Sequence, residues 1–261
     1  MWKELASTVL AAAQILVSSV GVSPETPPVD DAPKHIIHAA GMYKGIVGTN
    51  SLEALENAYN TGNRYIEIDF NFTIDLKPVC IHDWNHLAFS DYYGTKPFEK
   101  DFMNGQVYSL LSPMNLDTVA DFMRTHEDVY IITDVKDLNI CLSGIIKREH
   151  SDVMDRFIIQ VYSKEEYGYV SKLGFENIIF SLYKLDWESK TNVQDLVEFA
   201  KDNKLFGYTF PAALCDIDGY VDEMLKSGIP LFVHTINNKE EQKKYFDMGI
   251  SGIYTDNTTH E

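Results

Sequence analysis

The sequence is poor in positive charge and in cysteine. Its 261 residues contain 22 Lys and Arg against 39 Asp and Glu, a formal net charge of -17. Such a surface repels polyanions, which excludes nucleic acid as the bulk partner. The three cysteines, Cys80, Cys141 and Cys215, form no C-x-x-C pair, so we expect buried thiols and neither a disulfide framework nor a zinc cluster. Hydrophobic residues make up 45%, as in soluble globular proteins rather than multi-span membrane proteins.

The first 33 residues differ in composition from the rest of the chain. Lys3 precedes a run of small and apolar residues and then a polar segment rich in proline, a pattern typical of a secretory signal and its linker. Glu4 and Gln14 interrupt that pattern, so a helix packed on the domain is an equal alternative. A signal implies a secreted or cell-envelope protein, and a packed helix a cytoplasmic one. We therefore divide the chain into a signal peptide or N-terminal helix plus linker (1–33) and one domain (34–261).

From residue 35 onward, short β-branched runs alternate with amphipathic helical patterns, which is typical of parallel strands joined by crossover helices. Nine strands are expected, at His35–Ala39, Tyr65–Thr73, Pro78–Asp83, Val129–Lys136, Arg156–Tyr162, Asn177–Tyr183, Leu205–Phe210, Pro230–Ile236 and Gly252–Thr255. Helices are expected at Ser51–Thr61, Leu116–His126, Val193–Asn203 and Lys239–Met248. Several helical segments end in a glycine suited to a left-handed cap, namely Gly62, Gly174, Gly228 and Gly249.

The second and third strands are separated only by Ile74–Lys77, so they must form a hairpin. With Asp75–Leu76 as a two-residue turn, Asp69 lies opposite His82. Leucine is a poor residue for such a turn, and a slip by one residue would turn the histidine to the other face. Counting the hairpin as one strand with an extension leaves eight strands, which predicts a (β/α)8 TIM-type barrel. Trp84–Asn115 shows no clear periodicity and is expected to be an insertion or lid beside the barrel mouth.

Acidic residues gather at the ends of two predicted strands. Alternation places Glu67 and Asp69 on one strand face and apolar residues on the other. In the strand that begins at Val129, Asp134 and Lys136 share a face and leave the C-terminal end together, where barrel active sites are built. The three carboxylates form a plausible oxygen ligand set for one divalent cation, Ca²⁺ or Mg²⁺, and zinc is less favoured. A solvated strand edge and a surface ion pair are the alternatives.

Two histidines lie at comparable strand ends. His38 closes the first strand and His82 closes the hairpin return. Imidazole exchanges a proton near neutral pH, so a pair flanking a metal-bound phosphate suits general acid-base cleavage. Asp83 is placed to orient an imidazole, although an Asp after a strand also commonly starts a turn.

These residues form an ordered series of short motifs. They are Ile-Ile-His38 with Gly41, Asn50-Ser51-Leu52-Glu53-Ala54, Ile66-Glu67-Ile68-Asp69, Pro78-Val79-Cys80-Ile81-His82-Asp83, Asp134-Val135-Lys136 and Gly249-x-x-Gly252-Ile253-Tyr254-Thr255-Asp256. Each motif alone is unspecific, but their order and spacing resemble the glycerophosphodiester phosphodiesterase family, within the phospholipase C-like phosphodiesterase barrels. The resemblance covers roughly residues 35 to 257, a span that fits one barrel domain.

The resemblance implies roles for six residues. His38 and His82 would be the acid-base pair, and Lys136 would contact phosphate. The metal ligands would be Glu67, Asp69 and Asp134.

The chain departs from the family pattern at three places. Ala39-Ala40 stands where the family has an arginine for phosphate, and Asp134 stands where it usually has Glu. His234-Thr235-Ile236-Asn237 replaces a Trp-Thr-x-Asn pattern, so the aromatic substrate wall becomes a polar, titratable one at His234. These departures affect the expected substrate more than the expected reaction.

The expected activity is therefore metal-dependent hydrolysis of a glycerophosphodiester or related phosphodiester. A substrate hydroxyl would attack phosphorus, one histidine taking its proton and the other protonating the leaving alcohol, and water would open the cyclic phosphate. We assign His38 as base and His82 as acid, an order that the sequence leaves open. The partner would be a small-molecule or lipid-headgroup phosphodiester.

Two alternatives remain open. The first is a phospholipase acting on a lipid or cell-surface polymer, with peripheral membrane or cell-surface association. It is suggested by the apolar N-terminus and an aromatic loop containing Trp84, Phe89, Tyr92, Tyr93 and Phe98. The second is a non-catalytic barrel that binds phosphate or sugar, suggested by the missing arginine.

Overall fold

The computed structural model describes residues 32–85 and 94–259. The predicted signal peptide or N-terminal helix lies almost entirely outside the described residues, and so do Phe89, Tyr92 and Tyr93 of the aromatic loop. The expectation for the N-terminal segment therefore stays a prediction.

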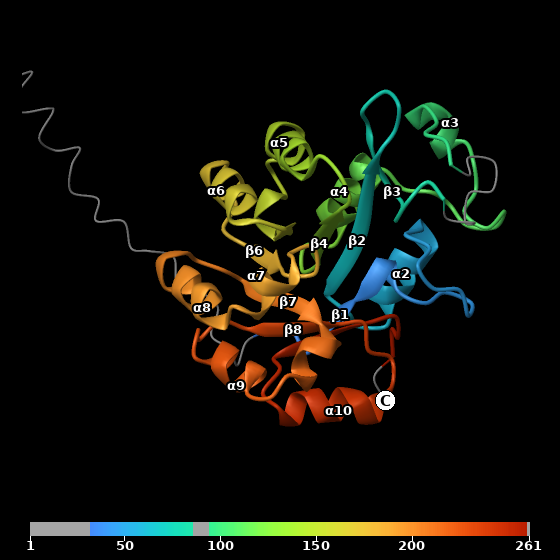
Figure 1. The fold of residues 1–261 in the computed structure, drawn as a ribbon. Coiled ribbons are helices and arrows are strands. Elements are labelled where there is room, and N and C mark those ends of the chain that lie inside the picture. Colours follow the sequence, from blue (N-terminus) through green and yellow to red (C-terminus); the bar gives the residue numbers. More distant parts are fainter. Residues whose placement is uncertain (1–31, 86–93, 260–261) are drawn as a thin grey trace, which may run out of the picture.

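Parallel strands form a closed barrel surrounded by helices (Figure 1). The strands are β1 (His35–Ile37), β2 (Tyr65–Phe72), β3 (Pro78–Cys80), β4 (Tyr130–Val135), β5 (Phe157–Val161), β6 (Ile178–Ser181), β7 (Gly207–Pro211), β8 (Leu231–His234) and β9 (Gly252–Thr255). Their order is β1-β9-β8-β7-β6-β5-β4-β2-β3, and an additional β1–β2 pairing closes the ring. Among the strands of the described residues, only β3 is antiparallel to its neighbour. The predicted eight-stranded TIM-type barrel is confirmed.

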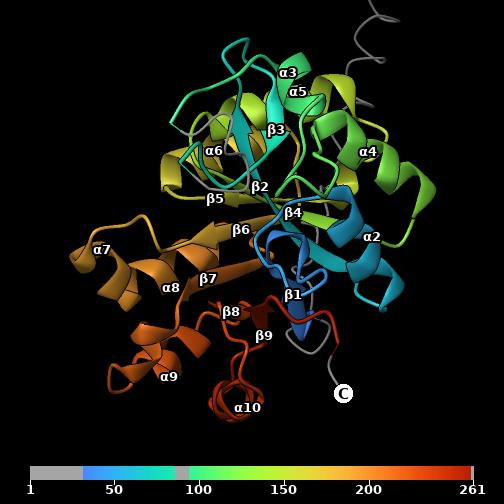
Figure 2. The same cartoon turned by 90° about the vertical axis from the view of Figure 1, so that its right-hand side faces the viewer.

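The helices lie outside the barrel, as the two views in Figures 1 and 2 show. They are α2 (Leu52–Asn60), α3 (Glu99–Met103), α4 (Leu116–Thr125), α5 (Asn139–Glu149), α6 (Lys164–Lys172), α7 (Trp187–Thr191), α8 (Val193–Asp202), α9 (Tyr220–Leu225) and α10 (Lys239–Asp247). Side chains of Ser51, Asn115 and Ser163 cap the starts of α2, α4 and α6. None of the helices in the described part of the chain has the length and apolar character needed to cross a membrane.

Strand alternation separates two apolar cores. Ile66, Ile68 and Phe70 point outward into the large core shared with the helices, whereas Ile132 belongs to a smaller core inside the barrel. The predicted faces of these strands are therefore confirmed. The prediction that all three cysteines are buried is wrong for Cys141, which is exposed on α5.

The predicted register of the hairpin is wrong by one residue. Phe70 pairs with Cys80 and Phe72 with Pro78, so Asp69 lies opposite Ile81 and its carbonyl accepts the Ile81 N–H at 3.1 Å. The cause is a three-residue turn, in which Leu76 adopts a left-handed φ of 58°. Because β3 already ends at Cys80, strand alternation no longer determines where the next side chains point.

The barrel closes at a thin seam between β1 and β2. Only Ile37 and Ile66 are paired across it, whereas β2 and β4 share six paired positions. A further hydrogen bond crosses the seam, in which the Ala39 N–H donates to Glu67 Oε2 at 2.7 Å. The seam runs directly into the barrel mouth.

The described part of the insertion builds a small core of its own. Trp84 packs edge-to-face on Phe102, and its indole N–H donates to Asn71 Oδ1 at 3.1 Å. Val79, Ile81, Val107 and Leu111 complete this core. Trp84 therefore packs the insertion, whereas Phe98 is exposed.

Candidate active site

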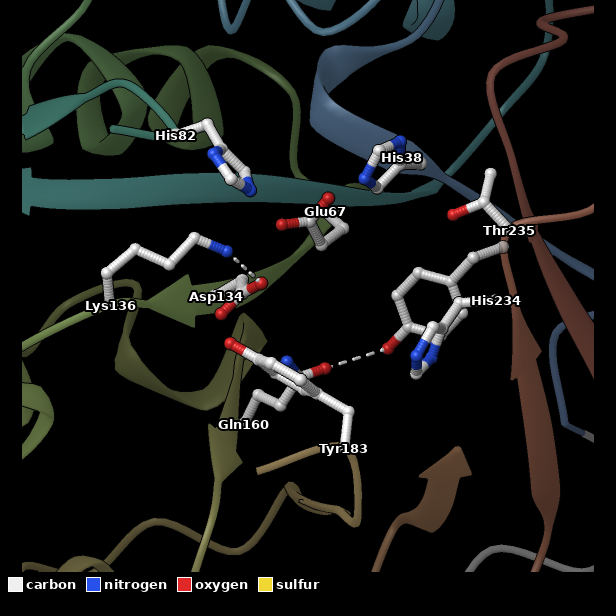
Figure 3. A pocket seen from close by; sticks show the side chains of 10 residues that line it. His38, Glu67, His82, Asp134, Lys136, Gln160, Tyr183, His234 and Thr235 are labelled. Carbon is white, nitrogen blue, oxygen red and sulfur yellow. Dashed lines mark hydrogen bonds and ion pairs between the residues drawn. The ribbon is translucent and has the colours of Figure 1, made fainter. Parts of the chain in front are cut away.

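One pocket of about 310 Å³ opens at the C-terminal ends of the barrel strands (Figure 3). It is lined by His38, Glu67, His82, Asp134, Lys136, Gln160, Tyr183, His234, Thr235 and Tyr254. The third acid, Asp69, offers an oxygen within 4.8 Å of ligand oxygens on Glu67 and Asp134. The pocket therefore brings together all seven residues that the sequence suggested for catalysis, metal binding and substrate contact.

Glu67 carries the least satisfied carboxylate of the site. Its Oε2 accepts the Ala39 N–H, but its Oε1 is buried and has no hydrogen-bond partner in the part of the chain that the structure describes. Burial raises the pKa of Glu67 to about 8, and the neighbouring Asp69 adds to the shift. A buried, unpartnered oxygen beside two further carboxylates fits a divalent cation, which prefers hard oxygen ligands.

The other two acids are held by hydrogen bonds. Asn50 donates to Asp69 Oδ2 at 2.9 Å, and the Asp69 N–H donates to Asn50 Oδ1 at 3.0 Å. Lys136 Nζ lies 3.0 Å from Asp69 Oδ1 and 2.7 Å from Asp134 Oδ2. Burial alone would lower the pKa of Lys136, but the charges of Asp69 and Asp134 raise it. Lys136 therefore stays protonated and supplies positive charge at the pocket.

His38 is oriented by a carboxylate from the far end of the chain. Its Nδ1 lies 2.8 Å from Asp256 Oδ1, and Asn237 donates to the other Asp256 oxygen at 2.6 Å. Burial would lower the pKa of His38, but the hydrogen bond to Asp256 and the charges of Glu67 and Asp69 outweigh burial and raise it to about 9.

His82 has the same kind of partner in a more open position. Its Nδ1 lies 2.7 Å from Asp83 Oδ2, and half of the His82 side chain is exposed. Each imidazole thus donates Nδ1–H to a carboxylate, an assignment that we make from these hydrogen bonds, and its Nε2 has no hydrogen-bond partner among the described residues. The expectation that Asp83 orients an imidazole is borne out by this geometry.

The opposite wall contains Gln160, Tyr183 and His234 (Figure 3). Tyr254 also lines the pocket. His234 Nδ1 lies 3.1 Å from Thr209 Oγ1, and burial lowers the pKa of His234 to about 4. The imidazole is therefore neutral near pH 7. The expected polar wall is present, but it does not change charge in the physiological range.

The segment in place of the arginine carries no cation. Ala39, Ala40 and Gly41 have left-handed φ values of 48°, 65° and 85°. Among the residues that line the pocket, Lys136 is the only lysine or arginine.

Several supporting residues were missed at the sequence level. Tyr162 donates to Asp134 Oδ1, Asn50 holds Asp69 and Asp256 holds His38. Tyr162 and Asp256 each follow the last residue of a strand, β5 and β9. A search of every strand end for polar residues could have found both.

A family model described as the glycerophosphoryl diester phosphodiesterase family matches residues 38–94 and 114–260. Among solved structures, a glycerophosphodiester phosphodiesterase from Thermotoga maritima is 21% identical with a TM-score of 0.66, covering 86% of this chain and 94% of its own. A glycerophosphodiester phosphodiesterase from Parabacteroides distasonis is 17% identical with a TM-score of 0.67, covering 85% and 92%. An Oleispira antarctica phosphodiesterase in complex with the product sn-glycerol-3-phosphate is 15% identical with a TM-score of 0.65, covering 86% and 93%. No curated protein matches the chain.

Proposed function

Because the chain belongs to the glycerophosphoryl diester phosphodiesterase family, and is therefore a phosphodiesterase, we propose that it hydrolyses a glycerophosphodiester with one divalent cation and two catalytic histidines. The observation that carries this proposal is the convergence of two carboxylate-paired imidazoles and three clustered acids on one pocket. Simple phosphate binding needs no such pairs of imidazole and carboxylate, so the site favours an enzyme over a non-catalytic barrel.

Glu67, Asp69 and Asp134 would hold the cation, Ca²⁺ or Mg²⁺. When bound, it neutralises charge that develops on a nonbridging phosphate oxygen. Lys136, which pairs with Asp69 and Asp134, would add a second positive contact to the phosphate. Pocket residues Gln160 and His234 would face the alcohol portion of the substrate.

The histidines move the protons. Nε2 of His38 removes the proton of the substrate hydroxyl as its oxygen bonds to phosphorus and closes a cyclic phosphate. The P–O bond to the leaving alcohol breaks, and Nε2 of His82 protonates that alcohol. The charges of Glu67 and Asp69 raise the pKa of His38. A cation held by these two carboxylates would offset that charge and so lower the pKa of His38, which favours a neutral base. Water then opens the cyclic phosphate with the two roles exchanged.

The histidine assignment is tested by substitution. His38→Ala and His82→Ala should each lower the turnover of glycerophosphocholine by roughly 10²- to 10⁴-fold. His126→Ala is the matched control, because this histidine packs against Tyr59 and Phe122 outside the pocket and should leave turnover unchanged. Near-normal turnover in both pocket variants would reject the assignment.

The cation and the substrate are tested together in one panel. Glycerophosphocholine, lysophospholipid, phosphatidylinositol and a teichoic-acid-like polymer are assayed with and without chelator. We expect hydrolysis of the first substrate, loss of activity with chelator, and recovery with Mg²⁺ or Ca²⁺. Unchanged activity in chelator would reject metal dependence, and a preference for acylated or polymeric substrates would favour the phospholipase alternative.

A further inference from the structure

Tyr162 lies just beyond the end of β5, and its hydroxyl donates to Asp134 Oδ1. The other Asp134 oxygen, Oδ2, is the one that faces Lys136. We propose that Tyr162 is a positioning residue that engages Oδ1 and thereby fixes the Asp134 carboxylate beside Glu67 and Asp69, where the cation would bind. This inference rests on the proposed function, because it assigns Asp134 to the cation.

The direction of the Tyr162 O–H is determined by its neighbours. The Val135 N–H donates to Tyr162 Oη at 3.0 Å, and Gln160 Nε2 donates to the same oxygen at 3.3 Å. With both lone pairs of the hydroxyl receiving donors, its proton has one acceptor left, Oδ1 of Asp134. The Tyr162 hydroxyl therefore cannot rotate away from the Asp134 carboxylate without leaving the Val135 N–H and Gln160 Nε2 without an acceptor.

The Tyr162 ring is also held in place. Lys184 Nζ lies 3.9 Å from the ring centroid, and the same ammonium donates to the carbonyls of Val135 and Lys136 at 3.2 and 3.0 Å. Tyr183 packs edge-to-face on the ring with centroids 5.6 Å apart. Tyr162 is only 5% exposed, so it acts as a rigid part of the barrel rim.

The hydrogen bonds continue across the barrel. The Tyr254 hydroxyl donates to Gln160 Oε1 at 3.2 Å, which orients the Gln160 amide so that its N–H groups face Tyr162. In this series Tyr254 donates to Gln160, Gln160 donates to Tyr162, and Tyr162 donates to Asp134. Residues of β4, β5 and β9 thus determine the orientation of the Asp134 carboxylate and limit its rotation.

Cation affinity in the absence of substrate tests the proposal. Chelator-treated protein is titrated with Mg²⁺ and with Ca²⁺ in a calorimeter. Tyr162→Phe should raise the dissociation constant roughly 10- to 100-fold, the usual effect of losing a residue that orients a metal ligand. The matched control is Tyr167→Phe, which also loses one hydroxyl bond, to the Lys204 carbonyl at 3.0 Å, and should bind both cations like the wild type.

A double-mutant cycle separates positioning from general structural damage. In Asp134→Asn, whose remaining acids should bind the cation more weakly, adding Tyr162→Phe should change the affinity by less than about twofold. An equal loss in both backgrounds, or no loss in either, would overturn the proposal.

A second variant serves if Tyr162→Phe does not fold. Gln160→Met keeps the Tyr162 hydroxyl but removes one of its two donors, and it should also weaken cation binding. Unchanged binding in Gln160→Met would refute the proposal. A wild-type protein that binds neither cation would overturn the proposed metal dependence itself.

Discussion

Replacing Asp256 by Asn should make the stability of the protein less dependent on pH. Asp256 accepts the hydrogen bond from His38 Nδ1 at 2.8 Å and is the first of the groups that raise the pKa of His38 to about 9. A folded-state pKa above the ordinary value of 6.5 stabilises the fold fully below pH 6.5, and the stabilisation is lost as pH rises through 9. The substitution removes much of this contribution.

The magnitude follows from the shift and from the exposure of the ring. A shift from 6.5 to about 9 corresponds to about 3.4 kcal/mol at full strength. Because 34% of the His38 side chain is exposed, solvent screening reduces this value, and we expect Asp256→Asn to lose about 1–2 kcal/mol of pH-dependent stability. The substitution also causes a loss of stability that does not depend on pH. In the wild type the Asn237 amide donates to Asp256, and in the variant it faces one side of the new amide.

Urea unfolding at pH 6, 7.5 and 9.5 in chelator measures the effect. The difference between wild type and Asp256→Asn should be largest at pH 6 and shrink to the constant part at pH 9.5. Glu67 titrates in the same range, but it does so in both proteins, so its contribution largely cancels from the difference. Asp83→Asn is the matched control, and it should change stability by no more than about 0.5 kcal/mol because the pair with His82 is half exposed. A difference that is constant, or that grows with pH, would refute the reasoning.

Two further predictions concern backbone conformation and are checked by urea unfolding. Leu76→Gly should raise the free energy of unfolding by about 0.5–1 kcal/mol, because Leu76 is 64% exposed and has a left-handed φ of 58°; a loss would contradict this explanation of the turn. Gly252→Ala should cost about 2–3 kcal/mol, because the new Cβ would lie 2.0 Å from the Pro33 carbonyl oxygen. Gly144→Ala in α5 meets nothing within 4 Å and should instead gain about 0.8 kcal/mol; the same sign for both glycine variants would argue against the steric account.

The elements of the barrel were predictable because they follow from local patterns. All nine expected strands and all four expected helices are present, with ends that differ by a few residues. The glycines expected to cap helices have left-handed φ values, from 68° at Gly228 to 96° at Gly174. Alternation in β2 also placed Glu67 and Asp69 on the inner face correctly, since an odd spacing would have separated them.

The hairpin register was not predictable in the same way. It depended on whether the turn has two or three residues, and a left-handed Leu76, which residue preference disfavours, is compatible with either length. His82 reaches the pocket nonetheless, because it lies two residues beyond the end of β3. His82 was therefore predicted correctly because it follows a strand end, although the predicted hairpin register was wrong.

The supporting contacts of the site were harder still to predict. Asp256 is 218 residues away from His38 in the sequence, and Tyr162 is 28 residues away from Asp134. Their contacts depend on closure of the barrel and on side-chain rotamers, which no local pattern encodes. The insertion was difficult for a related reason, because its core is assembled from residues of β3, α3 and irregular segments.

The seam between β1 and β2 is the most weakly paired joint of the barrel, and it lies beside the candidate active site. His38, the proposed base, follows β1, whereas Glu67 and Asp69 belong to β2, and a single paired position joins the two strands. Opening of this joint costs less than melting the whole barrel, and it carries the imidazole away from the carboxylates while the other joints persist. Moderate heating should therefore inactivate the enzyme reversibly, at temperatures where most of the barrel is still folded.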